Sequence, residues 1–241
     1  MRIWDIDPGY LNRQSLLGEH LELHGIASII INEKKGYSRH PETIRWLNYG
    51  WALHKRHRQL SAEMSLRGYV DKSPVHLKTN KGQWPDTYID QPFHQFEVLQ
   101  RKYKIKEPGR ILLPKNAQEL WRHHKYSVLA RDIKIYQAIG SQVSKLSPRD
   151  DFSDLAKIFS KILRVSPSKG GVRNSLQHMW GYVSKLTSTP QGAFEQWSLK
   201  ELLEQIQERA VKYNETYLLS STALAELMVW IDDDGIPAVR K

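Results

Sequence analysis

Residues 16–24, Leu-Leu-Gly-Glu-His-Leu-Glu-Leu-His, contain four side chains that can exchange protons or hold a charge. Glu19 and Glu22 are three residues apart, and His20 and His24 are four apart, so on a helix the members of each pair lie one turn apart on a shared face. A carboxylate placed in this way can act as a general base or stabilise positive charge on a substrate. The alternative for Glu22 is a solvent-facing helix carboxylate. Glu19 is expected to be structural or to support the site.

A second histidine pair, His54 and His57, has a spacing of three residues. Each pair alone supplies two metal ligands, and neither has a third ligand beside it, so no metal site is expected. The absence of cysteine excludes disulfides, thiolate zinc sites and a cysteine nucleophile. Glycine-rich phosphate loops, dinucleotide fingerprints, Gly-x-Ser-x-Gly elbows and His-Glu-x-x-His motifs are also missing from the sequence, and no cofactor is expected.

The 241-residue chain is basic, with 36 Lys and Arg against 26 Asp and Glu and a formal charge of +10. The charge is divided equally between residues 1–109 and the remainder. In the first half, basic residues alternate with aromatic rings, as in Lys-Lys-Gly-Tyr-Ser-Arg-His at 34–40. This combination suits phosphate contact together with stacking on bases. It is equally typical of a solvated helix face above core aromatics.

Apolar residues recur at helical spacing along most of the chain, and no strand-like alternation longer than about four residues occurs. We therefore expect an all-α fold of two helical domains, residues 1–108 and 112–241, joined by a short Pro/Gly linker within residues 104–110. Residues 69–92 contain several prolines and are expected to form a long ordered loop. The expected helices cover residues 12–33, 41–67 with a break at Gly50, 93–103, 115–130, 132–146, 151–164, 172–187, 197–213 and 217–231.

No apolar run approaches the roughly 18 residues that a membrane span requires. The first residues include acids and lack the apolar core of a secretory leader. We therefore expect a cytoplasmic protein without a membrane partner.

Several stretches of the first half match a known family in order and spacing. They are Met-Arg-Ile-Trp-Asp-Ile at 1–6, the 16–24 stretch given above, Lys-Lys-Gly-Tyr-Ser-Arg-His-Pro-Glu-Thr at 34–43, Leu-His-Lys-Arg at 53–56 and Ala-Glu-Met-Ser-Leu-Arg-Gly-Tyr at 62–69. Over most of residues 1–75 the chain resembles the pyrimidine-dimer DNA glycosylases, the phage endonuclease V type and its bacterial relatives.

The resemblance implies a nucleophile and an acid. The family attacks DNA with the free α-amine of its first residue and uses a glutamate on its first long helix; in this sequence these positions fall on Met1 and Glu22. Arg2 is expected to keep Met1 in place, because a long second side chain normally blocks methionine removal. An α-amine has a reference pKa of about 7.7–8.0, well below the ~10.4 of lysine, which suits attack near neutral pH.

The implied function is a DNA repair glycosylase with abasic-site lyase activity on pyrimidine dimers or a related lesion, and the implied partner is damaged double-stranded DNA. Two arginines that hold phosphates in the family are replaced by Leu21 and Gly25, and each lost charged contact costs on the order of 1–3 kcal/mol. The candidate DNA contacts are Arg2, Arg13, Ser15, His20, His24, Lys34, Lys35, Arg39, Lys55 and Arg56.

The second half resembles the YbgA-type domain of unknown function. The matching stretches are Trp-Arg-His-His-Lys-Tyr-Ser-Val-Leu-Ala at 121–130, Tyr-Gln-Ala-Ile-Gly at 136–140 and Gly-Gly-Val-Arg-Asn-Ser-Leu-Gln-His-Met-Trp-Gly-Tyr at 170–182, although Val172 stands where the family usually has histidine. No activity follows from this resemblance. The polar side chains expected to form a pocket, a phosphate site or an interhelical hydrogen-bond network are His124, Lys125, Tyr126, Asn174, Gln177 and His178.

Two other functions are compatible with the sequence. A non-catalytic nucleic-acid-binding protein would explain the neutral residue at position 21. An activity on RNA or a nucleobase would instead reside in the C-terminal domain.

Overall fold

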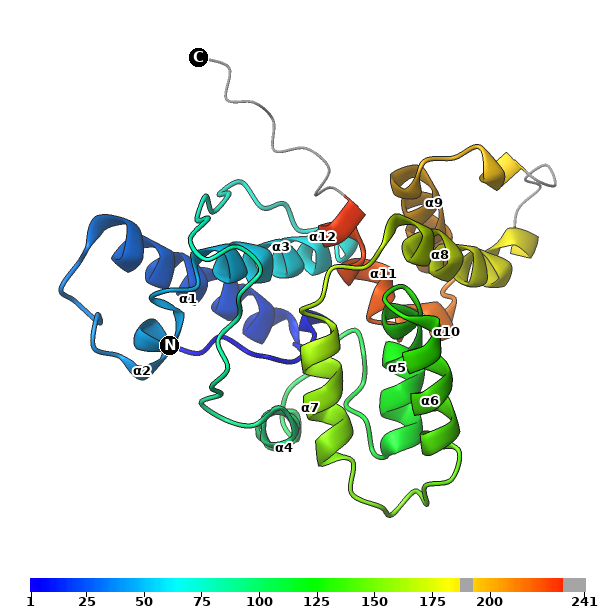
Figure 1. Ribbon diagram of the computed structural model, residues 1–241, viewed down its shortest axis with the longest axis horizontal. Helices are drawn as coiled ribbons and strands as arrows, with labels where there is room; N and C mark the ends of the chain where they lie inside the picture. The colour runs from blue at the N-terminus through cyan, green and yellow to red at the C-terminus, as the bar shows by residue number, and fades with distance from the viewer. Residues whose placement is uncertain (187–192, 232–241) are drawn as a thin grey trace. The chain divides into compact units, whose positions relative to one another are not determined.

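The computed structural model describes residues 1–186 and 193–231, which contain helices and turns and no strand (Figure 1). This confirms the all-α prediction. The chain separates into two compact units, residues 1–113 and 114–241. None of the described helices is both long enough and apolar enough to cross a membrane.

The first unit is built around two long helices, α1 (Arg13–Asn32) and α3 (Gly50–Leu66), which pack against each other. A 3-10 turn, η1 (Pro8–Tyr10), precedes α1, while α2 (Pro41–Trp46) lies between α1 and α3, and α4 (Pro92–Lys102) follows the long loop. The core is apolar because one side of each long helix is lined by fully buried leucines: Leu16, Leu23, Leu53 and Leu60.

Local capping signals set most helix ends in this unit. The Asn12 side chain accepts a hydrogen bond from the amide of Ser15 at 2.8 Å and starts α1. The helix expected over 12–33 is confirmed, and it ends at Glu33, which has φ +49. Gly50 breaks the stretch 41–67 as predicted and is the first residue of α3. A Cβ on Gly50 would lie 2.5 Å from Thr79 Oγ1, so glycine there lets the 69–92 loop approach.

The end of the expected linker is held within the first unit. The amide of Ile111 donates to the carbonyl of Gly9 at 2.9 Å, and a Cβ on Gly109 would lie 2.4 Å from the carbonyl oxygen of Tyr10. The Arg110 guanidinium binds the Glu63 carboxylate through two hydrogen bonds of 2.6 and 2.9 Å. These contacts attach residues 109–111 to η1 and α3.

Glu63 should make stability depend on pH. Its carboxylate is buried and also accepts from Arg67 at 2.7 Å. Burial alone would raise the Glu63 pKa, but Arg110 and Arg67 outweigh it and hold the pKa below the ordinary 4.5. A depressed pKa contributes stability that is present above the unfolded value and is lost as pH falls through the folded one. We expect Glu63→Gln to cost about 3–5 kcal/mol at pH 7, because two half-buried arginines lose the charge of their buried partner.

Urea unfolding of the wild type and the variant from pH 7 down to pH ~3 measures this. The difference in the free energy of unfolding between wild type and variant should become smaller in the acid range, because Glu63 is then protonated in the wild type as well. The exposed Glu97 provides the control substitution Glu97→Gln, which should change little. A difference in the free energy of unfolding that stayed constant from pH 7 to pH ~3 would show that the charge of Glu63 does not stabilise the fold.

The second unit packs its helices around α5 (Ala117–Leu129) and α9 (Leu199–Lys212). α5 contacts α6 (Ile133–Val143), α7 (Ser153–Ile162) and α8 (Lys169–Val183). The shorter elements are η2 (Ser184–Leu186), η3 (Ala193–Glu195), α10 (Thr216–Leu219), α11 (Ala223–Glu226) and α12 (Met228–Ile231). A capping box starts α9, in which Ser198 and Glu201 each bind the other's backbone amide.

Two helix predictions in this unit were wrong. The helix expected from residue 172 begins earlier, at Lys169, and a Cβ on Gly171 would lie 2.1 Å from the Ala130 carbonyl oxygen. The single helix expected over 217–231 is three short helices, because the Thr222 amide and hydroxyl both donate to the His123 carbonyl. Residue 187, the end of the helix expected over 172–187, lies outside the described residues.

Candidate active site

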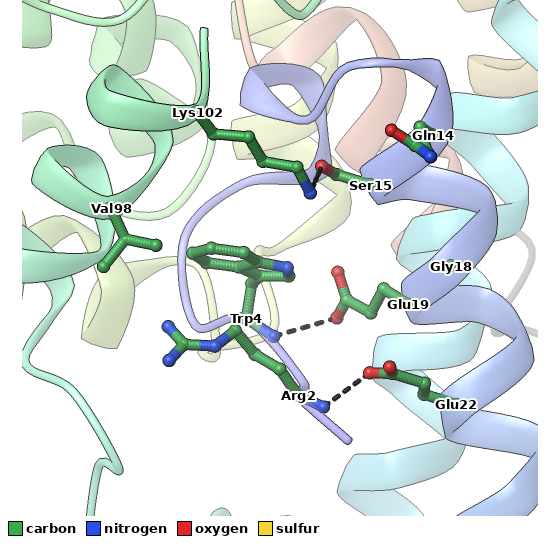
Figure 2. A pocket seen from close by; sticks show the side chains of 9 residues that line it. All are labelled: Arg2, Trp4, Gln14, Ser15, Gly18, Glu19, Glu22, Val98 and Lys102. Carbon is green, nitrogen blue, oxygen red and sulfur yellow. Dashed lines mark hydrogen bonds between the residues drawn. The ribbon is translucent and has the colours of Figure 1, made fainter.

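The first residues run along α1 and are attached to it by two glutamates (Figure 2). The amide of Arg2 donates to Glu22 Oε2 at 2.5 Å, and the amide of Trp4 donates to Glu19 Oε1 at 3.1 Å. The amides of residues 2 and 4 face the same side of an extended chain, just as positions 19 and 22 share a helix face. This match of two periodicities brings the start of the chain beside Glu22.

The two glutamates contribute to a pocket of about 290 Å³. Lys102 of α4 approaches from the opposite side and donates to Ser15 Oγ at 2.8 Å (Figure 2). The Arg2 guanidinium binds Asp90 at 2.6 Å and lies 4.8 Å from the Trp4 ring centre. The full lining is Arg2, Trp4, Gln14, Ser15, Gly18, Glu19, Glu22, Val98 and Lys102. Two cationic side chains therefore share this pocket with two carboxylates.

Glu19 and Glu22 have different surroundings. Glu19 is buried and accepts hydrogen bonds from the Arg56 guanidinium at 2.7 and 2.9 Å. Burial raises the Glu19 pKa to about 7, and Arg56 acts in the opposite direction. Arg56 also donates to the Ile6 carbonyl at 2.9 Å, so the pair fixes the N-terminal segment. Glu19 is structural, as expected, whereas Glu22 is only half-buried and lines the pocket.

Three of the expected DNA contacts are buried, and the structure corrects them. Arg56 is committed to Glu19, and the ammonium of Lys55 is buried 5.5 Å from the Trp51 ring centre. The hydroxyl of Ser15 is bound to Lys102. Basic and polar side chains are usually exposed, which is why these three were expected to contact DNA. In the structure they lie on the faces of α3 and of the start of α1 that pack against the rest of the unit. Lys55 and Arg56 therefore point into the unit, and Ser15 lines the pocket with its hydroxyl bound to Lys102.

Other expected DNA contacts are accessible. Arg2 is half-buried at the pocket, and His20 and His24 are half-buried on α1. The exposed aromatic Tyr37 lies in the same turn as three of the cations. The exposed cations are Arg13, Lys34, Lys35 and Arg39. The neutral Leu21 is 73% exposed, and a Cβ on Gly25 would have no neighbour within 4 Å.

The histidines do not group as their spacing suggests. His54 turns its Nδ1 to the Val75 carbonyl, whereas His57 joins His20 and His24. His24 Nε2 lies 3.3 Å from His20 Nε2 and 3.2 Å from His57 Nε2. Burial lowers the His57 pKa to about 4, although the charge of Asp71 acts in the opposite direction. Burial and the neighbouring His20 also lower the His24 pKa.

Asp71 completes this group, with carboxylate oxygens 3.3 Å from His20 Nε2 and 3.4 Å from His57 Nε2. The expectation that no third ligand stands beside the first histidine pair was therefore wrong. These four residues can hold a metal ion. Sequence reasoning missed Asp71 because no local spacing connects residues 24, 57 and 71; only the packing of α3 on α1 brings them together.

The polar residues expected to cluster in the second unit are divided between different surroundings. Lys125 Nζ lies 4.7 Å from the Tyr126 ring centre and 4.8 Å from that of Tyr217, and Tyr217 stacks on Tyr182 at 4.8 Å. Burial raises the Tyr126 pKa, as does its hydrogen bond with Tyr182. Tyr182 and Tyr217 were not among the sequence candidates.

The other four candidates do not form one pocket with this group. His124 is buried, its ring stacks on Phe159 of α7 at 4.8 Å, and burial holds its pKa well below the ordinary value. Gln177 and His178 are exposed on α8, and Asn174 is half-exposed. His124 therefore lies in the core of the unit, whereas Gln177 and His178 lie at its surface.

Comparisons with protein families match both units. Residues 1–77 match the family described as pyrimidine dimer DNA glycosylase, and residues 125–226 match a family of proteins of unknown function, DUF1722. No match was found among curated proteins or among solved structures. The first match includes Glu22, its partner Arg2 and the whole histidine group. The chain thus contains one region that matches the pyrimidine dimer DNA glycosylase family and a second region that matches a family of unknown function.

Proposed function

We propose that the N-terminal unit is a DNA glycosylase with abasic-site lyase activity, acting on double-stranded DNA that contains pyrimidine dimers or a related base lesion. The observation that carries the proposal is the hydrogen bond from the Arg2 amide to Glu22, which brings the α-amine of Met1 near a half-buried carboxylate in a pocket. The family match over residues 1–77 supports the substrate class.

In the proposed reaction the Met1 amine attacks C1′ of the deoxyribose, and the C1′–N bond breaks with its electron pair leaving on the base. Opening of the C1′–O4′ bond then gives an imine between the amine and C1′. Glu22 stabilises the positive charge that develops at the sugar. It then accepts the C2′ proton, and the C3′–O bond breaks with its electrons leaving on the phosphate. Water finally hydrolyses the imine and frees the amine.

DNA binding in this proposal uses the accessible cations. Arg2 and Lys102 lie at the pocket, and Lys34, Lys35 and Arg39 surround the exposed Tyr37 ring. Phosphate contacts from such groups make affinity depend steeply on salt. Because a glycosylase must extrude a nucleotide, an apolar side chain has to fill the space left in the duplex. A DNA repair role also places the protein in the cytoplasm, on the nucleoid.

Borohydride trapping tests the proposal. The full chain with its native N-terminus is incubated with duplex DNA containing an abasic site and, separately, with UV-irradiated duplex. We expect a covalent adduct on both substrates. An adduct on abasic DNA alone would support the lyase activity and exclude pyrimidine dimers as the substrate. No adduct on either DNA would overturn the whole proposal.

Extending the chain by two residues before Met1 should abolish the adduct, because the α-amine is then moved away from Glu22. The matched control carries the same two residues after Lys241 and should form the adduct normally. If both proteins are trapped equally, another amine is the nucleophile.

A non-catalytic DNA-binding protein is the second candidate, and the neutral, exposed Leu21 favours it. It predicts salt-dependent binding to DNA with no trapped adduct on any substrate.

A further inference from the structure

Three imidazoles and one carboxylate converge at the side of α1 that faces α3. The ligand atoms of His20, His24, His57 and Asp71 all lie within 4.8 Å of one another. Three of them are the same ring atom, Nε2, and the fourth ligand is a carboxylate oxygen. They come from α1, α3 and the segment that follows α3.

Four of the six separations between these atoms match those around a four-coordinate zinc ion. Ligands about 2.0–2.1 Å from such an ion lie about 3.3–3.4 Å from one another. The observed separations are 3.3 Å for His20–His24, 3.2 Å for His24–His57, 3.3 Å from His20 to Asp71 Oδ1 and 3.4 Å from His57 to Asp71 Oδ2. The other ligand atoms of the group lie within 4.8 Å of one another, so a bound ion would draw them closer. A second ligand set of this quality does not occur among the described residues.

Hydrogen bonding alone accounts poorly for this arrangement. A neutral imidazole Nε2 offers either one N–H or one lone pair, directed in the plane of the ring. His24 Nε2 nevertheless faces two other Nε2 atoms at hydrogen-bond distance. A cation at the centre of the group would accept the lone pairs of all three rings at once, which no set of ring protons can do.

The carboxylate is already oriented by neighbours outside the group. Ser61 Oγ donates to Asp71 Oδ2 at 2.8 Å, and the amide of Ser73 donates to Asp71 Oδ1 at 2.9 Å. Such outer contacts are typical of ligating carboxylates, because they hold the oxygen in place before the metal binds.

We propose that His20, His24, His57 and Asp71 bind one Zn²⁺ ion that clamps α1 to α3 and to the segment around Asp71. Nitrogen and oxygen ligands without sulfur suit a divalent first-row transition metal, and three imidazoles with one carboxylate are a ligand set that zinc takes. Four protein ligands close the coordination shell, as in structural sites. The ion therefore stabilises the helix that carries Glu22 and takes no part in chemistry at the pocket.

Metal analysis of the full chain tests the site, after removal of any affinity tag and of bound metal with a chelator. Dialysis against Zn²⁺ should load about one ion per chain. At a free zinc concentration 100 times the Kd, the unfolding temperature should rise by on the order of 10 °C. The variants His20→Gln and Asp71→Asn should bind no zinc, and zinc should not raise their unfolding temperature. The exposed His76, outside the group, provides the control His76→Gln, which should keep both the ion and the rise in temperature.

Zinc content in the two ligand variants equal to that of the wild type would overturn the proposal, as would a wild type that binds none. Because a variant can fail to fold, Co²⁺ is used as a second probe on the stripped wild type alone. The strong visible absorption of four-coordinate cobalt is expected, and the weak spectrum of six-coordinate cobalt would contradict the site. Neither measurement uses DNA, so the outcome is independent of the proposed glycosylase activity.

Discussion

Replacing Glu22 by glutamine should lower strand cleavage at abasic sites by about 10²–10⁴-fold, the usual contribution of a positioned general base. Glutamine keeps an oxygen that can accept the Arg2 amide, so the N-terminal segment should stay in place. What the variant loses is the negative charge beside the sugar and the acceptor for the C2′ proton. Single-turnover cleavage of a duplex with one abasic site measures the effect, and the trapped adduct on UV-irradiated DNA should fall with it.

The matched control is Glu97→Gln on α4, which removes an exposed carboxylate of the same unit. It should leave the cleavage rate within about twofold of the wild type, and both variants should unfold at the wild-type temperature within a few degrees. A Glu22 variant that cleaves at the wild-type rate would show that the carboxylate only holds the Arg2 amide.

The second large effect is expected at Arg56. Changing Arg56 to methionine leaves Glu19 buried without its cation and should cost about 3–5 kcal/mol of the free energy of unfolding at pH 7. The Glu19 pKa, already raised to about 7, rises further without the opposing charge. A raised pKa gives stability that is present below the unfolded value and is lost as pH rises through the folded value. The deficit of the variant should therefore be larger at pH 8 than at pH 5, which urea unfolding at both pH values measures.

A double variant separates the lost ion pair from lost packing. Adding Glu19→Gln to Arg56→Met removes the buried charge and should recover part of the stability at pH 8, a coupling that a double-mutant cycle measures. Arg101→Met, which removes an exposed arginine at the end of α4, is the control and should change stability little. If Arg56→Met lowers the free energy of unfolding by the same amount at pH 5 and pH 8, the loss comes from packing and not from the charge of Glu19.

Signals within a few residues set many of the helix ends, which is why most of the expected helix ranges were correct. The cap at Asn12, the start at His40-Pro41, the glycine after Arg67 and the Ser198–Glu201 box each act through bonds that span two to four residues. Where a distant carbonyl competed, prediction from local signals failed. The helix expected over 217–231 is interrupted because Thr222 binds the His123 carbonyl of α5, a partner 99 residues away.

The sequence by itself determined the all-helical class, the family resemblance of each half and the choice of Met1 and Glu22 as candidates, because these depend on residue types in order along the chain. Only the tertiary structure decided which polar groups face inward. It turned Arg56 toward Glu19, set the Arg2 amide on Glu22 and brought His57 and Asp71 to His20 and His24. Burial and contact between helices arise from packing on a shared core, and no spacing along a single helix carries that information.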